Sequence, residues 1–271
     1  MLNYTIIDAH CHVYPEKIAS KAADNIGIFY GYSVPPFDGI PGTLETMLKA
    51  GRSVGFAGYN ISGAATSPAQ VVSVNNGLIA ALNGFDGTEK LFAFGTAHPD
   101  FANVGDELER IKNAGLRGVK LHADCQRFNI DDRSAYQMYG AAQELDLPIL
   151  CHVGDENYDY SSPYRLLNLL KDFPRLRVIA AHLGGYREWD EGIKLAGTPN
   201  IWFDTCSAQS ILPPERVVTQ IRTLGAERCF FGTDYPLWNA DKELDSFMNL
   251  ELTDKEKEQI LGLNFLSFIN G

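Results

Sequence analysis

The apolar positions of this chain fall into short runs that are separated by longer segments of mixed polarity. The runs are about four to eight residues long and rich in β-branched and aromatic residues, which is typical of buried strands. They predict eight strands, at residues 4–7, 54–61, 91–96, 118–122, 149–153, 177–182, 200–205 and 229–234.

Most of the intervening segments predict helices. Ser67-Pro68 and Ser162-Pro163 resemble helix starts, since a proline in the first turn loses only an N–H that has no partner inside the helix. Thr43 is a further candidate cap, and Gly115 a candidate helix end. The predicted helices begin at Thr43 and then cover residues 67–83, 103–114, 132–146, 162–173, 213–225 and 253–269.

Strands that alternate with helices every 25–35 residues or so indicate an α/β fold with a parallel sheet. Eight such units predict a single-domain (β/α)8 TIM barrel over residues 1–271. The alternative is an open, doubly wound sheet. Against it, the first strand is not followed by G-x-G-x-x-G, and the chain has no G-x-x-x-x-G-K-[ST] nucleotide loop. Residues 13–42 are rich in glycine, proline and aromatic residues and are expected to form an irregular, functional loop.

Composition narrows the range of partners. The 271 residues are 45% hydrophobic, and 34 acidic against 23 basic residues give a net charge of −11. This balance argues against a nucleic-acid or anionic-membrane surface, where a basic field is expected. It does not exclude an anionic substrate, because a buried metal or one lysine can reverse the local field. The expected partner is a small molecule.

The five cysteines form no C-x-x-C pair. We expect them to be reduced and mostly buried, which fits a reducing compartment. The N-terminus lacks the basic and apolar segments of a signal peptide, and no apolar run approaches the ~20 residues of a membrane span. The expected location is the cytoplasm.

All six histidines lie at or just past the end of a predicted strand: His10, His12, His98, His122, His152 and His182. Asp234 ends the eighth strand in the same way. In a barrel these strand ends meet at one mouth, where the chemistry of this fold is found. A placement unrelated to function would scatter several of these side chains over helices and surface loops.

His10 and His12 are two residues apart, so in an extended chain their side chains point to the same face. Neutral imidazoles with a carboxylate suit Zn2+, and also Mn2+ or Fe2+. Such an ion lowers the pKa of its bound water to about 7 and polarises a substrate carbonyl. Cys11, between the two histidines, is expected to point away, and Asp8 to support the strand end through hydrogen bonds.

Five segments together resemble the amidohydrolase superfamily, within its amidohydrolase-related branch of small metal-dependent hydrolases and decarboxylases. They are Asp8-Ala9-His10-Cys11-His12, Gly118-Val119-Lys120-Leu121-His122, Cys151-His152-Val153-Gly154-Asp155, Ala181-His182-Leu183-Gly184-Gly185 and Gly232-Thr233-Asp234-Tyr235-Pro236. They run from residue 8 to 236 in the expected strand order.

The resemblance implies one divalent metal held by four residues, namely His10, His12, His152 and Asp234. It also implies a catalytic His182, which polarises the substrate or moves a proton, with Asp234 as a second proton carrier. Binuclear members of the superfamily carry a carbamylated lysine near the position of Lys120, so a second ion remains an alternative. Homo-oligomers are common in this branch.

Three further residues are candidate substrate ligands. Lys120 can hold a substrate carboxylate as a compact point charge. His122 either lines the substrate pocket or packs against the site. Arg165 either contacts substrate from the loop after the fifth strand or belongs to the surface; the same choice applies to Tyr158. His98, before Pro99, can simply cap its strand.

The predicted function is metal-dependent hydrolysis of a C–N or C–O bond, in an amide or a lactone, of a small carboxylate-bearing substrate through metal-activated water. The alternative, known in the same branch, is non-oxidative decarboxylation of a small aromatic or unsaturated acid. A third hypothesis, a barrel that binds a metal and a ligand without turnover, does not require the proton-transferring His182. A serine hydrolase is disfavoured because the chain has no G-x-S-x-G segment.

Overall fold

The computed structural model describes residues 4–31 and 42–271. It contains one parallel sheet in which each strand pairs with the next strand along the chain. The strands are β1 (Ile7–His12), β2 (Gly58–Ser62), β3 (Lys90–Thr96), β4 (Gly118–Leu121), β5 (Ile149–Cys151), β6 (Val178–Ala180), β7 (Ile201–Asp204) and β8 (Cys229–Phe230).

The sheet closes between its last and first strands. Beyond β8 the chain continues beside β1: the amide of Ala9 donates to the carbonyl of Phe231 at 2.9 Å, and the amide of Asp234 donates to the carbonyl of His10 at 2.7 Å. An open doubly wound sheet would leave both edges unpaired. The predicted single-domain (β/α)8 TIM barrel is therefore confirmed.

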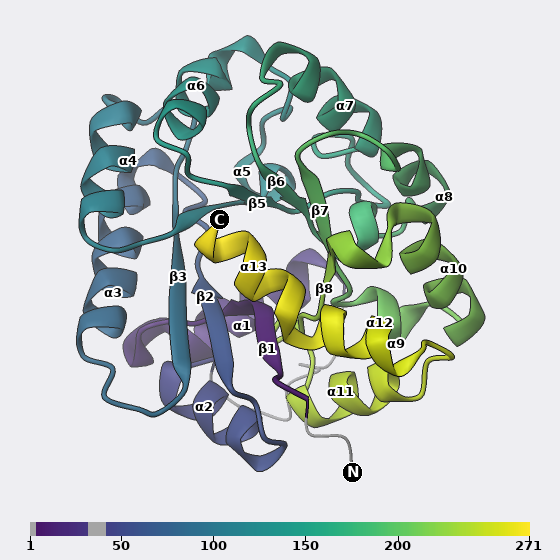
Figure 1. Cartoon of the computed structure of the whole chain (residues 1–271). Helices are drawn as coiled ribbons and strands as arrows, with labels where there is room; N and C mark the ends of the chain where they lie inside the picture. Colours follow the sequence, from purple (N-terminus) through teal and green to yellow (C-terminus); the bar gives the residue numbers. More distant parts are fainter. Residues whose placement is uncertain (1–3, 32–41) are drawn as a thin grey trace.

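Helices surround the strands (Figure 1). They are α1 (Glu16–Phe29), α2 (Leu44–Ser53), α3 (Val71–Asn83), α4 (Val104–Asn113), α5 (Ala123–Gln126), α6 (Tyr136–Glu144), α7 (Pro163–Asp172), α8 (Trp189–Gly192), α9 (Ala208–Ile211), α10 (Pro214–Leu224), α11 (Ala240–Met248), α12 (Asp254–Glu258) and α13 (Asn264–Asn270). Thr43 caps α2 as predicted, through a reciprocal pair of bonds with Thr46. Within the described ranges, none of these helices combines the length and apolarity needed to cross a membrane.

The prediction of an irregular segment over residues 13–42 is wrong for its first half, which forms α1. Its sequence has helix-forming Glu, Lys and Ala residues, with apolar side chains spaced for one face. The glycines and aromatic residues that follow hid this pattern. Residues 32–41, the rest of the predicted loop, lie outside the described part of the chain.

Several predicted strand ends are also wrong, most clearly at the C-terminal ends of the sixth and eighth strands, next to His182 and Asp234. β6 stops at Ala180 rather than at residue 182, and β8 stops at Phe230 rather than at residue 234. The backbone then turns away: His182 and Asp234 both have positive φ angles, of 60° and 58°. Their side chains thus stand on turns above the sheet, where the backbone conformation differs from that of a strand.

Two apolar layers hold the barrel together. The larger lies between the sheet and the surrounding helices. The smaller fills the barrel interior with residues such as Ile7, Leu150 and Phe230, and includes Phe265 and Phe268 of α13. Figure 1 shows α13 crossing the middle of the ring of strands. Burial of each phenylalanine ring contributes about 1.5–3 kcal/mol, so α13 stabilises the end of the barrel that it covers.

Candidate metal and catalytic site

Ligand atoms from both ends of the chain meet beside β1. Nε2 of His10 lies 3.2 Å from Nε2 of His12, and Oδ1 of Asp234 lies 3.1 Å from His12 Nε2 and 3.5 Å from His10 Nε2. The two imidazole planes cross at 73°. Two nitrogen atoms and one carboxylate oxygen that converge in this way are a donor set for Zn2+, Mn2+ or Fe2+.

A bulge in β1 turns the histidines toward this point. Asp8 pairs with Tyr59 and Cys11 with Ile61, so two residues of β1, Ala9 and His10, face the single Asn60 of β2. The extra residue changes the alternation of the strand. Cys11 consequently points into the outer core, as predicted, where its thiol donates to the Asn60 carbonyl.

Asp8 braces the turn that carries Asp234. Its carboxylate accepts the backbone N–H groups of His10 and Thr233 and the hydroxyl of Thr233. This confirms the expected supporting role of Asp8. Burial raises the pKa of Asp8 to about 7, although these three hydrogen bonds lower it. Burial would also raise the pKa of Asp234, but His10 and His12 hold that pKa well below the ordinary value, so Asp234 stays charged.

Three histidines of the site, His10, His152 and His182, are neutral at neutral pH. Burial, together with the charge of Lys120, lowers the pKa of His10 to about 4, and burial also lowers the pKa of His182. The same effect, reinforced by neighbouring histidines, holds the pKa of His152 well below its ordinary range. Neutral imidazoles have the lone pair that metal binding and proton acceptance require.

The structure does not place His152 in the group with His10, His12 and Asp234. Its Nδ1 lies 2.9 Å from Nε2 of His182, and its Nε2 lies 2.8 Å from the carbonyl of Gly154. His152 is therefore adjacent to the cluster through His182, with both ring nitrogens engaged. Its predicted role as a fourth ligand requires the exchange of one of these bonds.

His182 is held on three sides. Its backbone N–H donates to Asp204 at 2.9 Å, and its carbonyl accepts from the indole of Trp189 at 2.9 Å. The ring contacts His152 and also lies 5.6 Å, between centroids, from that of His10. The predicted proton carrier thus stands between the metal-ligand cluster and the fifth strand.

Lys120 and His122 each contact a histidine of the candidate site. Lys120 is buried, with Nζ 2.9 Å from Nε2 of His10. The ring of His122 stacks on that of His152, and its Nε2 lies 2.8 Å from the hydroxyl oxygen of Tyr30. Both predicted substrate ligands therefore border the metal-ligand atoms.

Arg165 is engaged elsewhere. Its guanidinium pairs with Asp131 at 2.8 Å and with Asp159 at 2.7 Å, both outside the histidine cluster. These two carboxylates neutralise the charge of Arg165, so the structure favours a surface role for Arg165 over contact with substrate. His98 accepts the amide of Asp100, as expected for a residue that ends a strand.

Three residues of the site escaped the sequence analysis. Asp204 ends β7, Cys206 follows it, and both residues contact His10 and His182. Burial by itself would raise the pKa of Asp204. The contact with His10 outweighs burial and lowers this pKa to about 2, so the carboxylate is charged. An aspartate at the end of the seventh strand was a usable signal. No signal in the sequence pointed to Tyr30, because it directly follows α1, a helix that the sequence analysis did not predict.

An aromatic wall covers the His122 side of the site. We use this name for Phe29, Tyr30, Tyr158 and Tyr186. The ring of Phe29 stacks on Tyr158 at 5.7 Å, and Tyr30 meets Tyr186 edge-on at 5.4 Å. A wall of this kind suits a planar, conjugated molecule.

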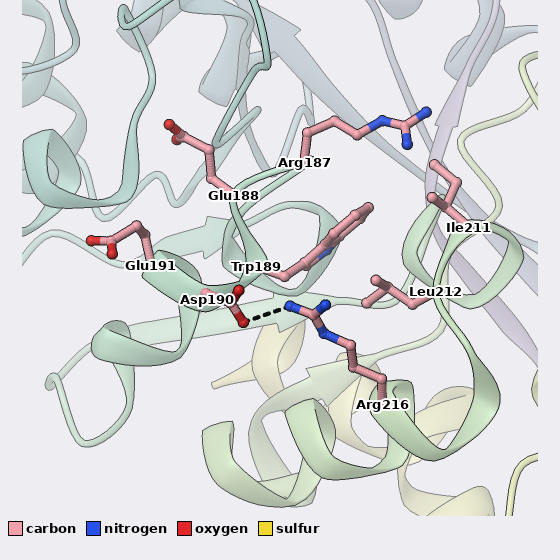
Figure 2. Close-up of a pocket in the computed structure, with 8 residues that line it drawn as sticks. All are labelled: Arg187, Glu188, Trp189, Asp190, Glu191, Ile211, Leu212 and Arg216. Carbon is pink, nitrogen blue, oxygen red and sulfur yellow. Dashed lines mark hydrogen bonds and ion pairs between the residues drawn. The ribbon is translucent and has the colours of Figure 1, made fainter.

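A separate cavity of about 520 Å3 lies between α8 and α10 (Figure 2). It is lined by Arg187, Glu188, Trp189, Asp190, Glu191, Ile211, Leu212 and Arg216. Arg216 pairs with Asp190 at 2.5 Å. Charges of both signs line it and no predicted site residue does, so this cavity is distinct from the metal-ligand cluster.

The model of the Amidohydro_2 amidohydrolase family matches residues 7–264. This range is nearly the whole chain and contains every residue of the cluster. The chain therefore belongs to the Amidohydro_2 family, and the resemblance inferred from its motifs is confirmed.

Solved structures with low sequence identity share the fold. The 5-carboxyvanillate decarboxylase of Sphingomonas paucimobilis aligns at a TM-score of 0.79 and 15% identity, over 99% of each chain. A dihydroxybenzoic acid decarboxylase of Polaromonas, with bound manganese and 2-nitroresorcinol, aligns at 0.74 and 15%, over 99% of this chain and 97% of its own. A Pseudomonas putida protein assigned as a 2-pyrone-4,6-dicarboxylic acid hydrolase aligns at 0.69 and 17%, over 99% and 98%.

Proposed function

We propose that this member of the Amidohydro_2 family is a metal-dependent hydrolase that opens a C–N or C–O bond, in an amide or a lactone, of a small carboxylate-bearing substrate. The observation that carries the proposal is the buried convergence of His10, His12 and Asp234, with a neutral His182 beside it. A binding protein without turnover would not need this proton acceptor.

The residues that would hold the metal are His10, His12 and Asp234, with His152 as the proposed fourth. A divalent cation supplies Lewis acidity there, which polarises a substrate carbonyl and acidifies water. We favour Zn2+ because two imidazoles and a carboxylate are common zinc ligands. Mn2+ remains an alternative, supported by the manganese in the Polaromonas decarboxylase structure.

Lys120 is the proposed anchor for a substrate carboxylate. Its ammonium group lies beside His10, and the whole side chain is buried. In such surroundings a single lysine interacts with a carboxylate far more strongly than in bulk solvent. The substrate would then contact the rings of Tyr30 and Tyr186, with its reacting carbon near the histidines.

His182 is the proposed proton carrier. Its Nε2 faces His152 and its Nδ1 lies 3.3 Å from the carbonyl of Cys206, so the ring is fixed while its pKa is low. A neutral imidazole can accept a proton from the attacking water and return it to the leaving group. Asp234, charged and adjacent, can assist from the other side.

Decarboxylation of a small aromatic or unsaturated acid is the second candidate. The aromatic wall favours it, because a planar acid would stack there with its carboxylate toward Lys120. The decarboxylases with the same fold support it as well. In that reaction His182 or Asp234 would first take a proton from water or from a substrate hydroxyl and then deliver it to the carbon that loses the carboxylate.

One assay separates the candidates. Zinc- or manganese-loaded protein is incubated with planar lactones, cyclic amides and hydroxylated aromatic acids, in water enriched in heavy oxygen. Hydrolysis predicts a new carboxylate that carries the heavy isotope and no CO2. Release of CO2 with no isotope in the product would assign decarboxylation. Tight metal retention with no turnover across the panel would contradict both and favour a binding protein.

A further inference from the structure

The carboxylate of Asp204 connects the two halves of the candidate site. It is fully buried at the end of β7. Oδ2 lies 2.9 Å from Nδ1 of His10, and Oδ1 accepts the backbone N–H of His182 at 2.9 Å and the thiol of Cys206 at 2.8 Å. One side chain therefore contacts both a proposed metal ligand and the turn that presents the proposed proton carrier.

These contacts determine which nitrogen of His10 carries the proton. A carboxylate only accepts hydrogen bonds, so Nδ1 of His10 must be the N–H. The other nitrogen, Nε2, faces the ammonium group of Lys120 at 2.9 Å, which only donates. Both observations agree: the lone pair of His10 is on Nε2, the atom that converges with His12 and Asp234.

We infer that Asp204 is a positioning residue that fixes His10 in its metal-binding tautomer and, through the N–H of His182, holds the proton carrier in register with the metal. The inference rests on the proposed metal-dependent function. Carboxylates that receive the second N–H of a metal-binding histidine orient the ring and raise its basicity, and their loss typically weakens metal affinity by about 10–100-fold.

The Asp204→Asn substitution tests the inference with little change in shape. Its amide can still accept the N–H of His182, but an NH2 group turned toward His10 would favour the tautomer with the proton on Nε2. Glu243→Gln is the matched control. Glu243 is also a fully buried carboxylate, and its partners are Gln209 and Ser210 rather than a proposed ligand.

Zinc affinity is measured by competition with a chromogenic chelator after the proteins have been stripped of metal. We expect Asp204→Asn to bind Zn2+ about 10–100-fold more weakly than wild type and Glu243→Gln to bind within twofold of it. Equal affinity of folded Asp204→Asn and wild type would overturn the inference.

Nitrogen NMR of the wild-type protein, with isotope-enriched histidine and no metal, gives a second test that needs no variant. We expect His10 to carry its proton on Nδ1. A proton on Nε2 would overturn the inference even if Asp204→Asn failed to fold. A wild type that binds no divalent metal would instead refute the proposed function, and the tautomer measurement would still decide the role of Asp204.

Discussion

The imidazole rings of His122 and His152 lie parallel, with 4.0 Å between their centroids and 7° between their planes. A nitrogen lone pair lies in the plane of its ring, so an ion shared by two imidazoles must lie where their planes meet. The planes of His10 and His12 cross at 73° and meet this condition. Those of His122 and His152 do not, although Asp124 lies close to both.

Substitution of His12 and His122 by alanine should therefore affect metal binding differently. We expect His12→Ala to lose most of its bound metal, because one of the three converging donors is removed. His122→Ala should keep its metal and show weaker substrate binding. Elemental analysis after dialysis is the measurement. Metal loss from His122→Ala but not from His12→Ala would place the ion beside His122 and His152 and contradict the proposed site.

Substitution of His182 should separate metal binding from proton transfer. We expect His182→Asn to retain the metal but to lower kcat by about 100- to 10,000-fold, the range typical of general acid–base residues. The measurement pairs metal content with steady-state kinetics on the substrate found in the panel. Tyr164→Phe is the control, since this exposed tyrosine bonds only to Asp159 among the hydrogen bonds described. Undiminished kcat in His182→Asn would transfer the role to Asp234.

Loss of the charge of Lys120 should mainly weaken substrate binding. Methionine has a similar length and suits the buried position, so Lys120→Met removes the ammonium group without leaving a large gap. We expect KM for a carboxylate substrate to rise by about tenfold or more, with a smaller change in kcat. A neutral ester of the same substrate should show no such rise. An equal effect on acid and ester would argue against a carboxylate anchor.

The order of the strands could be predicted because each apolar run is short and bounded by turn residues, and parallel strands leave a near-continuous apolar pattern. The convergence of His10, His12 and Asp234 could be predicted because the strand ends of a barrel meet at one mouth and because the motifs resemble those of a metal-dependent family. The periodicity of apolar residues does not show where the backbone turns at a strand end, and such turns change the direction in which a side chain points. The turn at His182 therefore directs its ring toward His152, and the missed α1 brings Tyr30 onto His122.

Glu243 should make the stability of the protein depend on pH. It is fully buried in α11, and burial raises its pKa to about 7 although Ser210 and Gln209 both donate to its carboxylate. A glutamate in the unfolded chain has a pKa of about 4.3. Between these two values the folded state holds a proton that the unfolded state has released, so the free energy of unfolding falls as the pH rises.

The contribution of protonated Glu243 is complete below about pH 4 and is lost as the pH passes through about 7. One pKa unit corresponds to about 1.4 kcal/mol, so the loss is on the order of 3 kcal/mol. Glu243→Gln keeps a neutral side chain at every pH. The buried Oε1 of Gln209 has no partner among the described residues, and it can accept from the new amide after the Gln209 amide rotates.

Urea unfolding of metal-free protein at several pH values between about 5 and 8 measures this effect. We expect the stability of Glu243→Gln relative to wild type to increase with pH up to about 7 and then to level off, because only the wild type loses the contribution of a neutral carboxyl. Asp132→Asn, at an exposed carboxylate that caps the turn before α6, should show no such upward trend. Parallel stability profiles for wild type and Glu243→Gln would show that Glu243 is ionised in the folded protein and that donors around it outweigh its burial.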